Sequence, residues 1–460
     1  MNPVIGYNEN LIEKEKKKLE EIKKNLTQEQ VQEILNNMKR IAEEQQKEQP
    51  LYLLPQIHLS DISKINDFKS VDDVINDKIN IFINPTNGVV YSRIVIVHEE
   101  CDIPNLWLIQ FLSVIVNKSI GAGRFNEYEL SMYSERWVSS LSISIKIVED
   151  VNCKKVIRIT ISCNCLNEDI DKLQELMKII STETHWDNHE KIELIANQQK
   201  SVLGKIVING MDTFNSIRAA ATLDAQSAIE EAVYGLTGFN KFCDFITQKP
   251  VNEIAESCEK LYKQILTNGK ITAYVSCGEK MKDKVVSAID DVIKTIEKVP
   301  KFEYTPVNYS DEVFSKIKSK KFFLNLPIPT GTVSLKKLCV KGDQIKQTTC
   351  LSILARILSN EALLDEVRDK NGAYSGFAYF SPRTGVFSIS TYRDTVPTKN
   401  YSAILEIIKN IDTYITDESV ERAVVSYLSQ IDAPKSPSIK GLYNAIQGIT
   451  KERNQKRRDI

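Results

Sequence analysis

The apolar positions of the first fifty residues recur every three to four positions, a spacing typical of one face of an amphipathic helix. They are Leu11, Ile12, Leu19 and Ile22 in a first stretch and Val31, Ile34, Leu35, Met38 and Ile41 in a second. Thr27 followed by Gln30 has the form of a capping box for the second helix, which ends before Pro50. Both stripes are narrow and flanked by charge, so residues 1–50 are predicted to form a helical hairpin that packs on another domain or links two halves of a larger protein. A coiled-coil dimerisation arm is the alternative, although the apolar repeat is short.

From Leu51 onward the same order of elements is found twice: a strand, a helix, a hairpin and two further helices. In the first copy the strand is predicted at 88–98, the helix at 105–116 and the hairpin at 129–148 with 155–164. Its two further helices are predicted at 169–180 and from Asp187 to a turn at Gly210. In the second copy the strand is predicted at 322–326 with 332–338, the helix at 344–360 and the hairpin at 372–392. Its two further helices are predicted at 401–411 and from Thr416 or Asp417 to a turn at Gly441. The order predicts an α+β fold of two similar domains, each an antiparallel sheet with helices packed on one face.

The two copies differ in how they end. The first continues into a strand at 271–276 and a helix at 281–299, whereas the second stops inside the charged helix 451–459. The predicted domains are therefore 51–300 and 301–460, and the second is expected to be truncated at its carboxy-terminal end.

Charge and composition exclude some classes of protein. The 460 residues are too many for one core and carry 60 basic against 61 acidic side chains. A protein that binds nucleic acid or an anionic membrane normally has a basic surplus, so the basic segment Lys451–Arg458 is predicted to be a solvated helix face. The most apolar run, Leu106–Val116, is too short to span a bilayer.

The cysteines and histidines do not form a metal-binding motif. Cys163 and Cys165 share a strand face but are too few for a zinc site, so the nine cysteines are interpreted as reduced thiols of an intracellular protein. His185 and His189 resemble an inverted HxxEH motif, yet Asn188 stands where its general-base glutamate would be. Asp187 followed by Glu190 instead indicates a capped helix start, with His185 before the helix and His189 in its first turn. No other catalytic motif is present, and the Gly121–Arg124 stretch is predicted to be a turn.

One segment carries a family signature. Leu363 to Gly376 contains an LxxxxR followed by GAYxG, and it continues into Ser381-Pro382-Arg383-Thr384-Gly385 and Tyr392-Arg393-Asp394. This pattern resembles the carboxy-terminal half of the insulinase and pitrilysin superfamily of zinc metallopeptidases, and within it the presequence-protease branch. Residues Ile431 to Pro434, Lys440 to Leu442 and Gly448 to Thr450 are similar as well, so the resemblance covers nearly the whole chain.

The resemblance implies a role for the chain as a whole. Enzymes of this family have four similar α+β domains in two halves that close like a clamshell around a chamber in which short unfolded peptides are degraded. This chain then supplies the linking hairpin, the third domain and most of the fourth, while the zinc ligands lie in an amino-terminal half that is its partner. The chain itself is expected to bind no zinc, to be inactive alone, and to belong to an intracellular enzyme, with an organelle such as the mitochondrion possible by family.

The signature segment also supplies candidate site residues. Phe380 paired with Val386 would put Tyr374, Gly376 and Ala378 on one hairpin face and Phe377 with Tyr379 on the other, which is then the core face. By resemblance, Tyr374 is the catalytic hydroxyl donor and Arg368 holds the peptide backbone or carbonyl. Gly372 and Gly376 border the peptide, and the Asn371-Gly372 turn aims both side chains at one point.

Simpler roles are available to the same residues. The small side chains also fit a sheet face covered by a helix, and Arg368 with Tyr374 also fits a helix cap and a packed ring. For the chain, the alternatives are a non-catalytic peptide-binding or scaffold relative and, less favoured, a free-standing helical-hairpin interaction protein.

Overall fold

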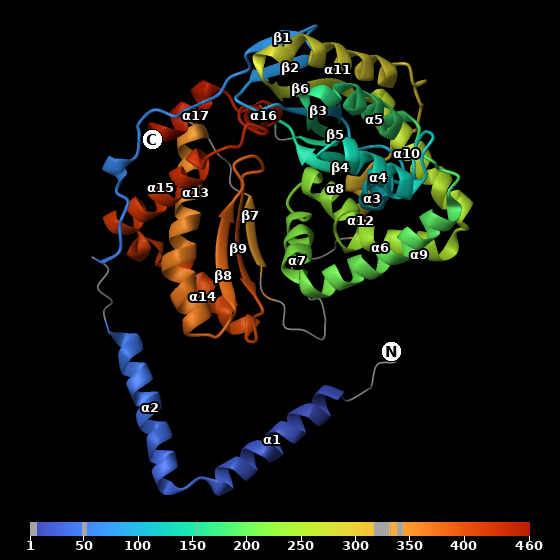
Figure 1. The fold of residues 1–460 in the computed structure, drawn as a ribbon. Coiled ribbons are helices and arrows are strands. Elements are labelled where there is room, and N and C mark those ends of the chain that lie inside the picture. The colour runs from blue at the N-terminus through green and yellow to red at the C-terminus, as the bar shows by residue number, and fades with distance from the viewer. Residues whose placement is uncertain (1–6, 48–52, 153, 317–330, 332, 338–343) are drawn as a thin grey trace. The chain divides into compact units, whose positions relative to one another are not determined.

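The computed structural model describes residues 7–47, 53–152, 154–316, 331, 333–337 and 344–460 (Figure 1). The chain divides into two compact units, Met1–His58 and Leu59–Ile460. The strand predicted at 322–326 lies outside the described residues.

The described residues of the first unit include the helices α1 (Tyr7–Asn25) and α2 (Gln28–Gln46). The predicted capping box is confirmed, because the Gln30 amide donates to Thr27 Oγ1 at 3.2 Å and the Thr27 amide donates to Gln30 Oε1 at 2.9 Å. The apolar stripe of α2 is exposed, from 40% at Val31 to 64% at Met38. The helices are therefore as predicted, and what their apolar stripes pack against stays a prediction.

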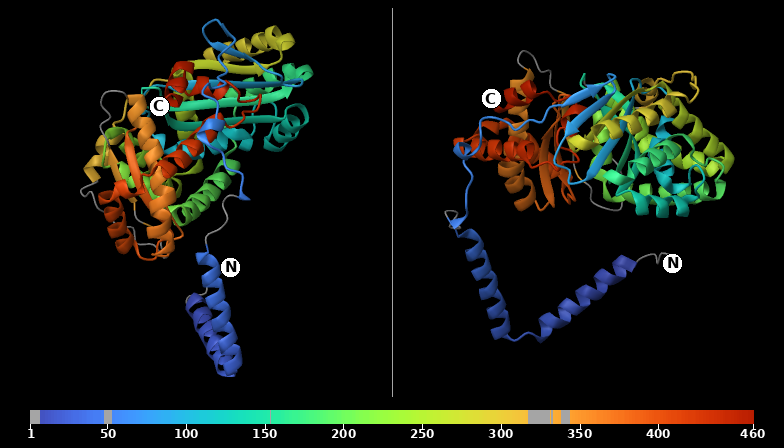
Figure 2. Two further views of the ribbon diagram at one scale, coloured as in Figure 1. Left: turned by 90° about the vertical axis from the view of Figure 1, so that its left-hand side faces the viewer. Right: turned by 45° about the horizontal axis from the view of Figure 1, so that its top comes forward.

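The second unit opens with a six-stranded sheet in the order β1-β2-β6-β3-β5-β4 (Figures 1 and 2). β2 and β6 run parallel, and the other neighbouring pairs are antiparallel. Strict alternation in β5 buries Ile157, Ile159, Ile161, Cys163 and Cys165 on one face, as the shared face of the two thiols predicted. The strands are β1 (Asp73–Ile75), β2 (Ile79–Ile83), β3 (Val89–His98), β4 (Ser140–Glu149), β5 (Lys155–Leu166) and β6 (Lys270–Cys277).

Helices cover that face of the sheet and complete its core. Ser92 on β3 donates to Cys163 O at 2.8 Å and reaches Met177 Sδ on α5 at 3.4 Å. The helices of this part are α3 (Ile109–Val114), α4 (Glu127–Trp137), α5 (Ile170–Thr182), α6 (His189–Asn209), α7 (Met211–Ala220), α8 (Ala225–Val233), α9 (Leu236–Gln248), α10 (Val251–Asn268), α11 (Lys282–Glu297) and α12 (Tyr309–Lys316). Because α3, α5, α10 and α11 contribute to the same core as this face, the predicted α+β class is confirmed.

A smaller sheet follows, in the order β7-β9-β8 within the described residues. Its strands are β7 (Val333–Lys337), β8 (Ser375–Phe380) and β9 (Val386–Tyr392). A separate core of Leu358, Ala362, Leu363, Val367, Ala373, Ile389, Ile404 and Ile407 joins this sheet to its helices. The helices in this part of the chain are α13 (Gln344–Ile357), α14 (Pro397–Lys409), α15 (Asp417–Asp432), α16 (Leu442–Ile446) and α17 (Lys451–Arg458). Of these, α13 and α14 contact that core.

Two predicted elements need correction. Residues 129–137 are helix α4 and not strand, because Asn126 and Glu129 form a capping box in which each side chain accepts from the other's backbone amide. Helix α6 is capped by Asn188 and not by Asp187, since Asn188 Oδ1 accepts from the Lys191 amide at 3.3 Å.

The prediction of a solvated face for the basic helix α17 holds for Lys451 and Lys456, which are exposed, and is wrong for Arg457 and Arg458, which are packed. Arg458 donates to both carboxylate oxygens of Asp432, at 2.8 and 2.7 Å, and to Ser63 O at 2.6 Å. Its side chain is 5% exposed, and burial lowers the pKa of the neighbouring Arg457. The segment that covers α17 lies almost 400 positions earlier in the chain, which helical periodicity alone does not reveal.

Candidate functional site

The signature residues lie around one turn at the end of a π-helical segment, Leu364–Asp369. The Lys370 amide donates to Asp365 O at 2.9 Å and the Gly372 amide donates to Arg368 O at 2.9 Å. Gly372 has φ +73°, a conformation that favours glycine after a helix end. This turn reverses the chain from Arg368 into β8, so that both sides of the signature meet at one place.

Tyr374 directly precedes β8 and is 65% exposed. Its amide donates to Tyr392 O at 3.1 Å, which ties it to the end of β9. Its ring meets the Tyr392 ring edge-on, with centroids 6.0 Å apart. The backbone is therefore fixed while the ring remains open to a ligand.

Two cationic side chains at this turn, Lys370 and Arg368, differ in whether they have acidic partners. Lys370 is paired with Asp365 and Glu366, each at 2.8 Å, and hydrogen bonding to Asp365 raises the pKa of Lys370. Arg368 is exposed and forms no ion pair or side-chain hydrogen bond within the described part of the chain. A guanidinium left open in this way can donate to a carbonyl or carboxylate oxygen.

The β8–β9 register differs from the predicted one by one residue. Phe380 pairs with Phe387 and not with Val386, so Ala378 lies opposite Ile389 and Gly376 opposite Thr391. The predicted faces of β8 are consequently exchanged, whereas Ile389 and Phe387 of β9 belong to the core side.

Phe377 and Tyr379, predicted to be core, are 38% and 61% exposed. The face with the small residues is the one that packs on the helices. A Cβ atom on Gly376 would lie 3.0 Å from a methyl of Val367 and 3.2 Å from Leu363. The glycine permits close packing of β8 on the π-helical segment, which is the simpler role considered for it.

A buried polar network that the sequence did not predict ties this turn to α14 and to the segment after β9. Asn371 donates to Asn400 Oδ1 at 2.8 Å, and Asn400 in turn donates to Asp394 Oδ1 at 2.8 Å. Asp394 also accepts from Thr391 Oγ1 and from the Val396 amide, both at 2.8 Å. Asp394 and Asn400 are 1% and 0% exposed. The signal available in the sequence was the run Tyr392-Arg393-Asp394, which begins at the last residue of β9, but no local pattern linked it to Asn371.

Two histidines of the larger unit, His98 and His185, have structural partners for their side chains, and His189 is exposed. His185 contacts Gly123 O through Nε2 at 2.7 Å, and His189 is the exposed first residue of α6. His98 is buried between Glu100 O, 2.7 Å from Nδ1, and the Tyr304 hydroxyl, 3.0 Å from Nε2. Among the residues placed by the structure, no group of three or more His, Cys, Asp or Glu side chains can hold a metal ion. The zinc that the family resemblance implies therefore has no fitting ligand set in the described chain.

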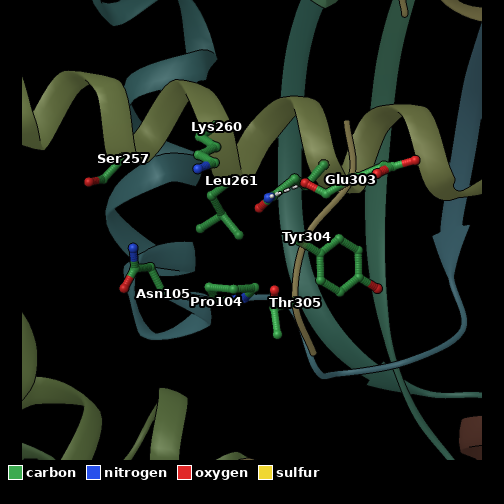
Figure 3. A pocket seen from close by; sticks show the side chains of 9 residues that line it. Pro104, Asn105, Ser257, Lys260, Leu261, Glu303, Tyr304 and Thr305 are labelled. Atoms are coloured by element: carbon green, nitrogen blue, oxygen red, sulfur yellow. Dashed lines mark hydrogen bonds between the residues drawn. The ribbon is translucent and has the colours of Figure 1, made fainter. Parts of the chain in front are cut away.

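Two hollows lie away from the signature turn. One, of about 440 Å³, lies between α10 and Glu303–Thr305, with Lys260 and Tyr304 on its wall (Figure 3). The other, of about 560 Å³, is bordered by Lys78, Gly269 and Glu297. Neither is lined by residues of the smaller sheet or its helices, so neither adds to the site. No helix in the described ranges is long and apolar enough to cross a membrane.

Comparison with known families covers most of the chain. Residues 1–245 match the family model of the associated domain of M16 peptidases, subfamily C, and residues 321–460 match the "PreP C-terminal domain". The mitochondrial presequence protease of Saccharomyces cerevisiae is 24% identical over 91% of this chain and 43% of its own length. Protein HypA of Clostridium perfringens is 25% identical over 96% of this chain and 45% of its own length. The chain thus spans less than half the length of these relatives.

Solved structures support the fold. A peptidase M16 inactive domain from Pseudomonas fluorescens matches with a TM-score of 0.53 and 12% identity, covering 83% of this chain and 88% of that one. The periplasmic protease PqqL from Escherichia coli matches with a TM-score of 0.53 and 14% identity, covering 95% of this chain and 48% of that one.

Proposed function

Since this chain belongs to subfamily C of the M16 peptidases and corresponds to the carboxy-terminal half of the presequence-protease branch, we propose that it is the non-catalytic half of a peptide-degrading metallopeptidase. It contributes substrate-binding and transition-state-stabilising residues to a centre whose metal ligands lie in an amino-terminal half. The substrates are short unfolded peptides held in a chamber between the halves. The relatives named mitochondrial make an organelle the proposed compartment.

The observation that carries the proposal is the placement of Arg368 and Tyr374. Both side chains are exposed, and they stand on the two sides of one turn fixed by Gly372. Hydrolysis of an amide builds negative charge on its carbonyl oxygen, and a hydroxyl placed at that oxygen stabilises the transition state. In this proposal the Tyr374 hydroxyl donates to that oxygen, while Arg368 donates to the peptide backbone or carbonyl nearby.

Reassembly tests the proposal. The purified chain would be mixed with the zinc-bearing half of a presequence protease, and turnover of a short fluorogenic peptide measured. Turnover is expected from the mixture and from neither part alone, and metal analysis of this chain alone is expected to find no stoichiometric zinc. Two halves that co-elute in gel filtration but never cleave the peptide would favour the second candidate, a peptide-binding or scaffold relative. Absence of any association would contradict both.

A further inference from the structure

Arg393 has an unusual backbone for its residue type. It directly follows β9, is exposed, and has φ +47°, in the left-handed region that an arginine seldom adopts. Such conformations persist where the surroundings fix them, and they cluster at functional sites.

The surroundings that fix Arg393 are the buried polar network described above. The next residue, Asp394, is 1% exposed and accepts hydrogen bonds from Thr391, Val396 and Asn400. A carboxylate with three donors, buried directly beside the left-handed residue, leaves the backbone at Arg393 little freedom to relax. The same network reaches Asn371 in the turn before Tyr374, so the positions of Arg393 and Tyr374 are coupled.

The guanidinium of Arg393 lies over two aromatic rings. Its central carbon is 5.7 Å from the Tyr374 ring centroid and 5.5 Å from that of Tyr392. A cation–π contact of this kind does not require the N–H groups of the guanidinium, which can still donate to the oxygens of a ligand. Over the ranges that the structure describes, those N–H groups have no acidic or hydrogen-bonding partner.

Building on the proposed function, we propose that Arg393 is a specificity-determining residue that binds a carboxylate of the peptide next to the bond held by Tyr374. The planar fork of donors matches the two oxygens of a carboxylate. The carboxylate belongs either to an acidic side chain or to the carboxy-terminus of the peptide. Arg368 and Arg393 then place positive charge on two sides of Tyr374, and a peptide with a negative group near the scissile bond is preferred.

Binding to the full chain tests this inference without any catalysis. Three versions of one ten-residue unfolded peptide would be titrated: blocked at both ends without acidic residues, the same with a free carboxy-terminus, and blocked with one central aspartate. The readouts are the Arg Nε–Hε signals in NMR spectra and the dissociation constant. We expect the Arg393 signal to move with one or both acidic peptides, and Arg393→Gln to weaken that binding about tenfold. Which of the two peptides responds identifies the source of the carboxylate.

Arg136→Gln is the matched control, because Arg136 stacks on Trp137 at 5.0 Å on the distant helix α4. It should leave all three affinities unchanged. Equal loss of all three peptides in Arg393→Gln would mean that Arg393 only packs, and would overturn the inference. So would the lack of any Arg393 shift up to about 5 mM acidic peptide. Either result leaves reassembly with the zinc-bearing half unaffected, so failure of the inference is separable from failure of the proposed function.

Discussion

Phe380 lies directly opposite Phe387 across the β8–β9 pair, with the two ring centroids 6.2 Å apart. The connection between the two paired residues is one residue longer than in the predicted pairing of Phe380 with Val386. Gly385 adopts φ +70° and donates to Ser381 O at 2.9 Å, while Ser381 itself donates to Val386 O at 2.9 Å. Because side chains alternate along a strand, this single residue moves Gly376 to the helix-covered face and Tyr379 to the open one.

Replacing Gly376 with alanine should destabilise the chain. The added methyl would meet Val367 and Leu363 at 3.0 and 3.2 Å, both on a buried helical face that has little room to move. Overpacking of this kind costs about 1–3 kcal/mol of unfolding free energy. Gly204→Ala is the control, since nothing lies within 4 Å of its added methyl inside α6. The unfolding free energy of Gly204→Ala should be unchanged or higher by about 0.5–1 kcal/mol.

Urea unfolding of the two glycine variants checks the exchange of faces. Had Gly376 stood on the open face, the variants at 376 and 204 would behave alike. An unaltered midpoint for Gly376→Ala would therefore contradict the register described above.

A structural feature can be predicted from the sequence pattern when the residues that determine it lie close together along the chain. The capping box at Thr27 and the amphipathic helices are local, so pattern alone predicts them. The order of elements and the family signature likewise identify the fold and the Arg368–Tyr374 turn. The cover over α17 and the link from Asn371 to Asp394 are not predicted, because each joins segments brought together only by the tertiary fold. The hairpin register fails for a different reason, since both registers give plausible apolar faces and the loop decides between them.

The start of α6 offers a second test. Asn188→Ala should lower the unfolding free energy by about 1 kcal/mol or more, because its side chain caps Lys191 and also donates to Ile120 O at 3.3 Å. Asp187→Ala, one residue away and exposed, should change it by less than about 0.5 kcal/mol. Thermal unfolding of the pair distinguishes the two caps, and equal effects would argue against Asn188 as the cap.

Alkaline pH should destabilise the chain through its buried thiols. Burial raises the pKa of Cys101 and of Cys165 to about 12 and that of Cys277 to about 11. A thiol in the unfolded chain ionises near pH 8.5, so this stability is complete below about pH 8.5 and declines as pH rises toward the folded values.

The slope of stability against pH measures this effect. Each such thiol contributes about 1.4 kcal/mol per pH unit between those limits. Urea midpoints from pH 8 to pH 10.5 should therefore fall less steeply in Cys165→Ala than in the unmodified chain. Cys350→Ser, at an exposed position, should leave the slope unaltered, and a change there equal to that of Cys165→Ala would refute the explanation.

The proposed role of the Tyr374 hydroxyl as a donor to the reacting carbonyl has a direct kinetic test. In the reassembled enzyme, Tyr374→Phe removes a single hydroxyl and keeps the ring that packs against Tyr392 and Arg393. If that hydroxyl acts only in the transition state, kcat should fall by roughly 10²-fold or more while KM changes little. Arg368→Ala should raise KM and also lower kcat, because in this proposal Arg368 holds the peptide backbone in the bound substrate and adds to the stabilisation of the carbonyl oxygen in the transition state. Tyr128→Phe, which alters a tyrosine of similar exposure on α4, should leave both constants as they are. A Tyr374→Phe enzyme with unimpaired kcat would show that the hydroxyl does not reach the reacting carbonyl, and the exposed ring would then act only in binding the peptide.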